Sequence, residues 1–114
     1  MKKAYRVKTE ADFQKVFHQG QSMANRQFVV YTIAKEGQPH FRAGISVGKK
    51  LGNAVKRNSI KRRIRHSLIE FDQEGLIKPD LDFIVIARQP VSAMDYHDIK
   101  KSLLHVLKRS HILK

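Results

Sequence analysis

The side chains best suited to bind a ligand lie in one segment, residues 49 to 65, where eight of seventeen residues are Lys or Arg. Ammonium and guanidinium groups bind phosphate, and arginine offers a planar fork that can make two hydrogen bonds to one phosphate. Gly48 and Gly52 would let backbone N–H groups approach an anion closely. Asn58 can donate to and accept from a base edge or a 2′-hydroxyl. The segment therefore predicts a surface that binds a nucleic-acid backbone.

Residue spacing predicts that these cations share one exposed face of a helix. Asn53 is a typical N-cap, and residues 54 to 71 contain no Gly or Pro, which predicts a helix about 27 Å long. Side chains four residues apart line up in rows on such a helix. One row is Arg57, Lys61 and Arg65, and the row beside it is Asn58 and Arg62. Like charges at this spacing weaken an isolated helix by a few tenths of a kcal/mol per pair, so a bound polyanion would stabilise it.

The positive charge of the chain is concentrated in its middle third. The whole sequence carries 23 Lys and Arg against 10 Asp and Glu, for a net charge of +13. Residues 1 to 36 contribute +4 (seven basic, three acidic), residues 37 to 69 contribute +9 (nine basic, none acidic) and residues 70 to 114 contribute zero (seven of each). Because like charges packed closely repel each other, we expect a polyanionic partner that neutralises them.

Two other interpretations of the basic segment are weaker. A basic helix on an ordinary surface carries acidic residues among the basic ones, whereas residues 37 to 69 include none. Residues 44 to 50 faintly resemble a phosphate-binding P-loop, but the spacing is one residue short and no Ser or Thr follows the lysine. We therefore do not expect nucleotide hydrolysis.

No set of residues predicts that the chain cleaves RNA by itself. Its six histidines show no metal-binding spacing supported by carboxylates, apart from residues 95 to 98, which helix capping explains better. Asp80 and Asp82 follow Pro79 at the entry to a strand, and we interpret them as turn residues. We therefore expect neither a catalytic residue nor a metal ligand in the protein.

Three aromatic side chains, Phe13, Phe17 and Tyr31, could hold unpaired bases. Phe13 and Phe17 lie four residues apart on the first predicted helix, and such a stripe usually belongs to a core. Tyr31 is evenly balanced between the two roles, because its hydroxyl needs water or a partner. Stacking on an aromatic ring contributes about 1 to 3 kcal/mol per base and demands no particular sequence. From the residues alone, both interpretations stay open.

Capping residues and periodicity predict two further helices. Thr9 caps a short helix that Gly20 ends, and either Ser92 or Asp95 caps the last helix. Apolar residues at helical spacing should face the core. These are Ile60, Ile64, Leu68 and Phe71 on the basic helix, and Tyr96, Ile99, Leu103 and Val106 on the last helix.

Three strands are predicted between these helices. Residues 26 to 35 and 41 to 47 alternate in polarity, and the turn at 36 to 39 suggests that they form an antiparallel pair. Residues 81 to 87 are apolar except for Asp82, which predicts a buried central strand parallel to an earlier one. The order α-β-β-α-β-α indicates an α/β fold of the α+β sandwich type, with helices packed on a sheet.

Length and composition limit the classes of protein to which the chain can belong. A chain of 114 residues, 41% of them hydrophobic and 29% charged, is expected to form one RNA-binding domain over residues 1 to 114. No apolar run is long enough to span a membrane, and no signal peptide follows the N-terminal lysines. The absence of cysteine fits a reducing compartment. We therefore expect a cytoplasmic protein that does not bind membranes.

The basic segment also resembles a known family. Its pattern Lys-x-x-Gly-Asn-Ala-Val-x-Arg-Asn-x-x-Lys-Arg-x-x-Arg is similar to the signature of the bacterial ribonuclease P protein subunit. The resemblance extends to residues 11 to 17, 24 to 31 and 84 to 88, and so covers nearly the whole chain. It implies a small, mostly antiparallel sheet of about four strands and a left-handed β-α-β crossover around the basic helix.

The resemblance also implies a function. In that family the RNA subunit removes the 5′ leader of precursor tRNA by Mg²⁺-dependent hydrolysis, and the protein is an accessory subunit. The implied partners are ribonuclease P RNA and the single-stranded leader, with a monomeric protein, one copy per RNA, and Mg²⁺ held mainly by the RNA. The residues implied to contact the catalytic RNA are Lys49, Lys50, Asn53, Arg57, Asn58, Lys61, Arg62 and Arg65. Those implied to line a leader-binding cleft are Phe13, Phe17 and Tyr31.

Two alternatives come from other functional classes. A ribosomal-protein-like RNA-binding module fits the charge and the fold class equally well, but would confer no cleavage of precursor tRNA. A DNA-binding regulator fits less well, because the basic helix lacks the short preceding helix and turn of a helix-turn-helix motif.

Overall fold

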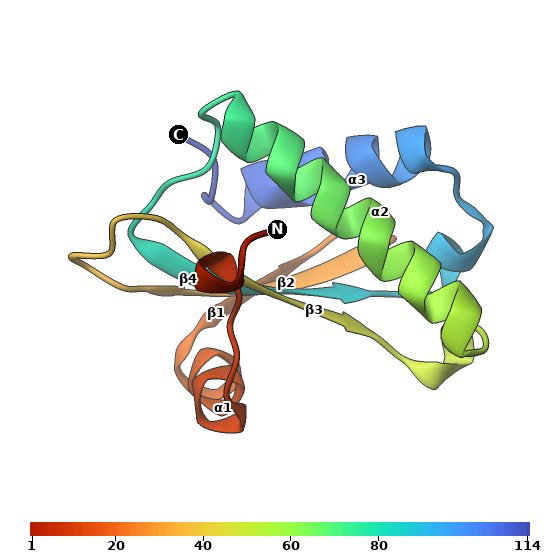
Figure 1. Ribbon diagram of the computed structural model, residues 1–114, viewed down its shortest axis with the longest axis horizontal. Coiled ribbons are helices and arrows are strands. Elements are labelled where there is room, and N and C mark those ends of the chain that lie inside the picture. The colour runs from red at the N-terminus through yellow and green to blue at the C-terminus, as the bar shows by residue number, and fades with distance from the viewer.

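A four-stranded mixed sheet separates helix α1 from helices α2 and α3 (Figure 1). This arrangement is that of a computed structural model, which describes all 114 residues. The strands are β1 (Gln21–Ala24), β2 (Phe28–Ala34), β3 (Arg42–Val47) and β4 (Leu81–Ala87). The helices are α1 (Glu10–Gln19), α2 (Ala54–Gln73) and α3 (Tyr96–Arg109), with short 3-10 turns η1 (Lys3–Tyr5), η2 (Lys49–Leu51) and η3 (Gln89–Ala93). The predicted fold class is confirmed.

The strand order is β1-β2-β4-β3, which corrects one predicted pairing. Strands β2 and β3 do not pair, because β4 lies between them, antiparallel to β2 and parallel to β3. The most apolar strand takes the centre, where both of its faces are covered. Strand β4 is therefore the predicted buried strand parallel to an earlier one, and α2 forms the crossover from β3 to β4.

Strand β1 was not predicted from the sequence. It pairs antiparallel with β2 at the edge of the sheet, and its first three residues are exposed. Because a solvated edge strand needs little apolar surface, its four residues lack the alternating pattern that reveals a buried strand. Two of the three strand pairings are thus antiparallel.

All three long helices begin at side-chain caps. The backbone N–H of Asp12 donates to Thr9 Oγ1 (3.1 Å), and that of Lys56 donates to Asn53 Oδ1 (2.9 Å). At the last helix the cap is Asp95, whose Oδ1 accepts from the backbone N–H of residue 98 at 2.8 Å. Each bond satisfies a backbone donor that has no partner within the helix. The predicted helix starts are therefore confirmed, with Asp95 chosen over Ser92.

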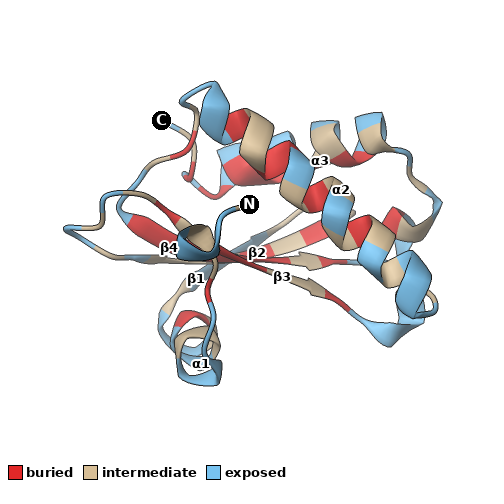
Figure 2. Cartoon of the chain, in the orientation of Figure 1, coloured by how far each residue is buried: buried red, intermediate tan, exposed pale blue.

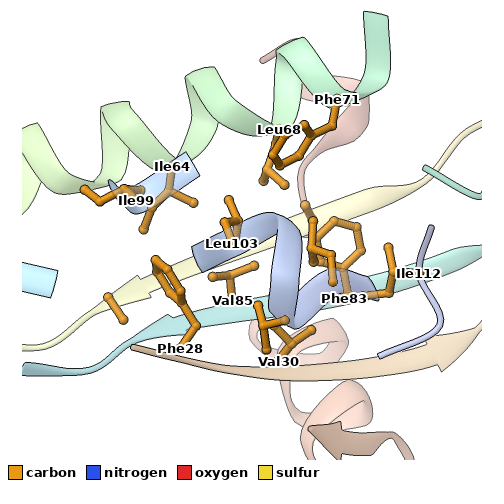
Figure 3. Close-up of a cluster of buried hydrophobic side chains, with 14 of the residues drawn as sticks. Phe28, Val30, Ile64, Leu68, Phe71, Phe83, Val85, Ile99, Leu103 and Ile112 are labelled. Atoms are coloured by element: carbon orange, nitrogen blue, oxygen red, sulfur yellow. The ribbon is translucent and has the colours of Figure 1, made fainter. Parts of the chain in front are cut away.

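The main core lies between the sheet and the pair α2 and α3 (Figure 3). Side chains predicted to face inward on these helices are fully buried, with the exception of Tyr96, which is half-buried. The buried set on the helices is Ile60, Ile64, Leu68, Phe71, Ile99, Leu103 and Val106. They meet the sheet residues Phe28, Val30, Phe83 and Val85, which are 0% exposed. Burial of this apolar surface is the main stabilising term of the fold.

An ion pair holds α1 against the opposite face of the sheet. Arg42 donates through Nε and Nη2 to the two carboxylate oxygens of Asp82, at 3.0 and 2.6 Å. The same guanidinium lies 3.6 Å from the carboxylate of Asp12 on α1. The hydrogen bond to Asp82 raises the pKa of Arg42 above its ordinary value, although partial burial opposes the shift. The interpretation of Asp82 as a turn residue was wrong: it lies inside β4, is 1% exposed, and needs Arg42 to neutralise it.

No helix of the chain combines the length and the apolar character that crossing a membrane requires.

Candidate nucleic-acid interface

The predicted cations form one surface at the start of α2 and in the turn before it. Exposed and half-buried positions alternate along the start of α2 (Figure 2). Lys49, Lys50 and Arg62 are exposed, whereas Arg57 and Lys61 are half-buried. All ion pairs of the chain within 4.0 Å involve only Arg42, His66 or Lys100 as the basic partner. No carboxylate therefore neutralises residues 49 to 65. We call Lys49, Lys50, Arg57, Asn58, Lys61 and Arg62 the basic surface.

The turn that carries Lys49 and Lys50 is fixed on both sides. Leu51 is 5% exposed and anchors the turn in the core. Gly52 follows with φ at +140°, a conformation that residues with a Cβ rarely adopt. The side-chain oxygen Oδ1 of Asn53 then caps α2 by accepting from the backbone N–H of Lys56. Only the side-chain NH₂ group of Asn53 is left to donate to a ligand. The sequence predicted Asn53 as a cap, which the structure confirms, whereas its contact with RNA is implied only by the family resemblance.

Arg57 and Asn58 differ in how they are held. Asn58 is exposed, and none of the hydrogen bonds within the chain involves its side chain. The Nε atom of Arg57 is buried and has no acceptor within the chain. A buried donor without a partner costs about 1 to 3 kcal/mol, so an acceptor that met this atom after rotation of the side chain would recover that free energy. The neighbouring Val55, an apolar side chain that is 78% exposed, was not singled out from the sequence.

Near its C-terminal end, α2 is tied to α3 by a polar network. Tyr96 donates its hydroxyl proton to Glu70 Oε1 at 2.6 Å, and Lys100 forms an ion pair with Glu70 Oε2. The hydrogen bond from Lys100 lowers the pKa of Glu70, and the same bond raises the pKa of Lys100. Burial, followed by the bond to Glu70, raises the pKa of Tyr96. This network fixes the orientation of α2 and so of the basic surface.

The three aromatic residues lie together where α1 meets the sheet. The ring centroids of Phe13 and Phe17 are 6.4 Å apart, and those of Phe17 and Tyr31 are 5.1 Å apart in an edge-to-face arrangement. All three side chains are half-buried, unlike the phenylalanines of the main core. We call Phe13, Phe17 and Tyr31 the aromatic row. They form a connected set that is partly open to solvent.

Close packing at Gly44 positions Phe13. A Cβ atom at residue 44 would lie 2.8 Å from the Phe13 ring, so only glycine allows the ring to rest on β3. Across the sheet, Ile84 pairs with Gly44 on one side and with Tyr31 on the other. The side chain of Tyr31 therefore lies on the face of the sheet that Phe13 covers.

The next row of that face is less covered. Ser46, Ile86 and Val29 pair across β3, β4 and β2, and all three are half-buried. Helix α1 covers the other end of the face, where Arg42 reaches Asp12 (Figure 1). From Ser46 the strand β3 leads directly into the turn that carries Lys49. The open half of the face, which we define as Val29, Ser46 and Ile86, thus connects the aromatic row with the basic surface.

Acidic residues and histidines do not gather into a metal-binding group. No set of three or more His, Asp or Glu side chains lies close enough together to hold an ion. Asp95 is used as a helix cap and Asp82 as the partner of Arg42.

A family model described as Ribonuclease P matches residues 1–111. The ribonuclease P protein component of Listeria monocytogenes is 58% identical over 114 residues, which are 100% of this chain and 94% of that protein. That of Ligilactobacillus salivarius is 59% identical over 113 residues, covering 99% of this chain and 98% of the relative.

Solved structures agree with the sequence relatives. The Staphylococcus aureus RNase P protein superimposes with a TM-score of 0.87 at 52% identity, covering 98% of this chain and 100% of that one. The RNase P protein of Thermotoga maritima superimposes with a TM-score of 0.79 at 33% identity, covering 91% and 96% of the two chains.

Proposed function

The chain belongs to the ribonuclease P protein family, and from that premise we propose which of its surfaces meets which RNA. As a member it is an accessory protein subunit of an endoribonuclease that acts in tRNA processing, and it associates with ribonuclease P RNA. The relatives are ribonuclease P proteins, so the ribosomal-protein alternative is not favoured. We propose that the basic surface binds the catalytic RNA, and that the aromatic row binds the single-stranded leader of precursor tRNA.

One observation carries the first assignment: the basic surface has no acidic partner within the chain. Exposed Lys and Arg side chains there can exchange their counterions for phosphates, and Arg57 offers a buried donor that has no acceptor. The amide of Asn58 adds a group that can bind a base edge or a 2′-hydroxyl. Asn53 contributes through its free NH₂ group while its carbonyl holds the helix start.

The second assignment rests on the partial exposure of the aromatic row. Three neighbouring rings on a fixed sheet face offer surfaces on which unpaired bases can stack. Stacking tolerates any base, which suits leaders that differ from one precursor to another. The half-buried residues Val29 and Ile86 extend this apolar floor beyond α1.

We further propose that Mg²⁺ is held mainly by phosphates of the RNA subunit and that one monomeric chain binds each RNA. Magnesium ions favour oxygen ligands in octahedral geometry, and the chain offers no cluster of three carboxylates or histidines. Bound Mg²⁺ supplies charge stabilisation in phosphodiester hydrolysis. The chain's own contribution is positive charge beside the RNA and a platform for the leader.

Reconstitution tests the proposed function. The purified chain is mixed with a bacterial ribonuclease P RNA and precursor tRNA, and cleavage at millimolar Mg²⁺ is compared with that of the RNA alone. We expect the chain to accelerate release of the leader. Absence of any acceleration, with the chain folded and bound to the RNA, would contradict the proposal.

Charge-neutralising variants locate the RNA-binding surface. Arg57→Gln and Lys61→Gln should each weaken binding to the RNA subunit and lower the slope of log affinity against log salt by about 0.7 to 0.9. The control is Lys108→Gln, which removes an exposed charge from α3, outside the basic surface. Equal effects of all three variants would show that only net charge matters, and that the basic surface has no specific role.

A further inference from the structure

A second cationic site lies beyond the basic surface, at the outer edge of strand β3. Arg6 and Arg65 both line a small pocket of about 130 Å³ together with Phe13, Gly44 and Ile45. Met1, Val7 and Ala43 complete its lining, so the pocket contains two guanidinium groups and no carboxylate. Two arginines that share a pocket without an acidic partner form a site suited to an anion.

The arginines reach this pocket from two segments that are distant in sequence. Arg6 belongs to the N-terminal segment, which pairs with β3 through a bridge to Ala43. Its Nη2 donates to the carbonyl of Met1 at 3.3 Å, whereas its Nε is buried and has no partner. Arg65 comes from the middle of α2. Burial lowers the pKa of Arg65, and the nearby charge of Arg6 lowers it further.

The strand itself adds a donor. The carbonyl of Ala43 accepts a bond from the Val7 N–H at 3.1 Å, so this residue's polar groups point to the outer edge. The two-residue alternation of a strand directs the N–H and C=O of Ile45 to the same edge. No residue of the N-terminal segment pairs with them. An anion in the pocket would therefore meet two guanidinium groups beside an open backbone N–H.

The pocket is continuous with the aromatic row. Phe13 belongs to both: its ring rests on Gly44 inside the pocket, and it neighbours Phe17 in the row. Arg65, which also lines the pocket, lies one helical turn beyond Lys61 of the basic surface. A strand of RNA with bases on the aromatic row would thus place its backbone at the edge of β3.

We infer that Arg6 and Arg65 bind one phosphate of the precursor-tRNA leader at the edge of β3, where the leader passes from the aromatic row toward α2. This inference rests on the proposed leader-binding function and refines it. It assigns Arg65, expected from the family resemblance to contact the catalytic RNA, to the leader. It also adds Arg6, which no sequence pattern singled out.

The first experiment combines protein and RNA substitutions in the reconstituted holoenzyme. Arg6→Gln should weaken binding of leader-bearing precursor about tenfold, as expected for loss of one charge-assisted phosphate contact, and leave binding of mature tRNA unchanged. The matched control Lys8→Gln removes an exposed charge two residues away, outside the pocket, and should change precursor binding less than about twofold.

Uncharged methylphosphonate linkages, placed one at a time along the leader, identify the phosphate. At one position the substitution should weaken binding to the unaltered holoenzyme about tenfold, yet add little to the effect of Arg6→Gln, since the contact is already lost. Equal penalties in both holoenzymes at every position would overturn the inference. A loss of affinity for the RNA subunit itself, with unchanged discrimination between precursor and mature tRNA, would assign the phosphate to the catalytic RNA and also overturn it.

A second measurement does not require substitution of either arginine. The chain contains no cysteine, so Ile45→Cys provides one thiol at the pocket for a short photoreactive cross-linker. We expect cross-links to the leader, and none from the control Leu104→Cys on α3. Cross-links absent from Ile45→Cys, with cleavage activity retained, would contradict the inference. If Phe17→Ala and Tyr31→Ala still weaken leader binding in that case, the proposed function stands and only the phosphate site fails.

Discussion

The two faces of the sheet use similar apolar residues in different ways. On the face under α2 and α3, Phe28, Val30 and Phe83 are fully buried in one continuous core. On the face under α1, Phe13, Phe17 and Tyr31 remain half-buried, because one ten-residue helix covers only part of that face. The closed face therefore supplies the stability of the fold, and the open face keeps aromatic surface available for a ligand. The same residue type should respond differently to substitution on each face.

The largest expected effect is on the closed face. Phe28→Ala removes a fully buried ring and should lower the free energy of unfolding by about 3 to 5 kcal/mol, measured by urea denaturation. Phe17→Ala on the open face should cost about 1 kcal/mol, since part of the ring already contacts water. Similar losses for both variants would remove the distinction between the faces.

Removing the ion pair beneath α1 should have the next largest effect on the free energy of unfolding. Asp82→Asn leaves the Arg42 guanidinium without its buried counter-charge and should lower the free energy of unfolding by about 3 kcal/mol. Asp80→Asn is the control, because its side chain is exposed and makes no ion pair. An Asp82→Asn variant as stable as the control would show that the Arg42–Asp82 pair does not stabilise the fold.

Gly44 tests how tightly the aromatic row is packed. Gly44→Ala brings a methyl group to 2.8 Å from the Phe13 ring and should cost about 1 kcal/mol while displacing that ring. Binding of leader-bearing precursor should weaken, and binding of mature tRNA should not change. Gly48→Ala is the control, since a Cβ atom there has no neighbour within 4 Å. Unaltered leader binding in Gly44→Ala would show that the position of Phe13 is unimportant.

The smallest effect concerns the network between α2 and α3. Because the folded pKa of Glu70 lies below its unfolded value, its charge stabilises the fold above the unfolded pKa. That contribution is lost as pH falls through the folded pKa. Glu70→Gln should therefore make stability, measured by thermal unfolding, fall less steeply as the pH is lowered than in the exposed control Glu36→Gln. Parallel pH profiles for the two variants would contradict this role.

Local features of the fold were predictable, and long-range pairings were not. Thr9 and Asn53 act on backbone groups three residues away, and the apolar stripe of α2 follows from helical spacing. The position of β4 between β2 and β3 depends on contacts distant in sequence. The same holds for the Arg42–Asp82 pair, whose members are 40 residues apart. No local pattern indicates which arginine will meet which carboxylate.

In the candidate site, too, the features set by local spacing were predictable, and those set by contacts distant in sequence were not. The basic surface was predicted because its cations lie on one helix and in the turn before it, so sequence spacing determines their geometry. The exposure of the aromatic row could not be decided from spacing, since it depends on how much of the sheet α1 covers. The pocket shared by Arg6 and Arg65 arises only when the N-terminal segment pairs with β3.

Affinity as a function of leader length tests the open face most directly. The reconstituted holoenzyme is titrated with precursor tRNAs whose leaders grow one nucleotide at a time, using the unaltered chain, Phe17→Ala and Tyr31→Ala. We predict that affinity rises with leader length for the unaltered chain, and that each variant loses about 1 to 3 kcal/mol of this gain while binding mature tRNA equally well. An identical gain in all three proteins, or equal losses for precursor and mature tRNA, would contradict the assignment of the aromatic row to the leader.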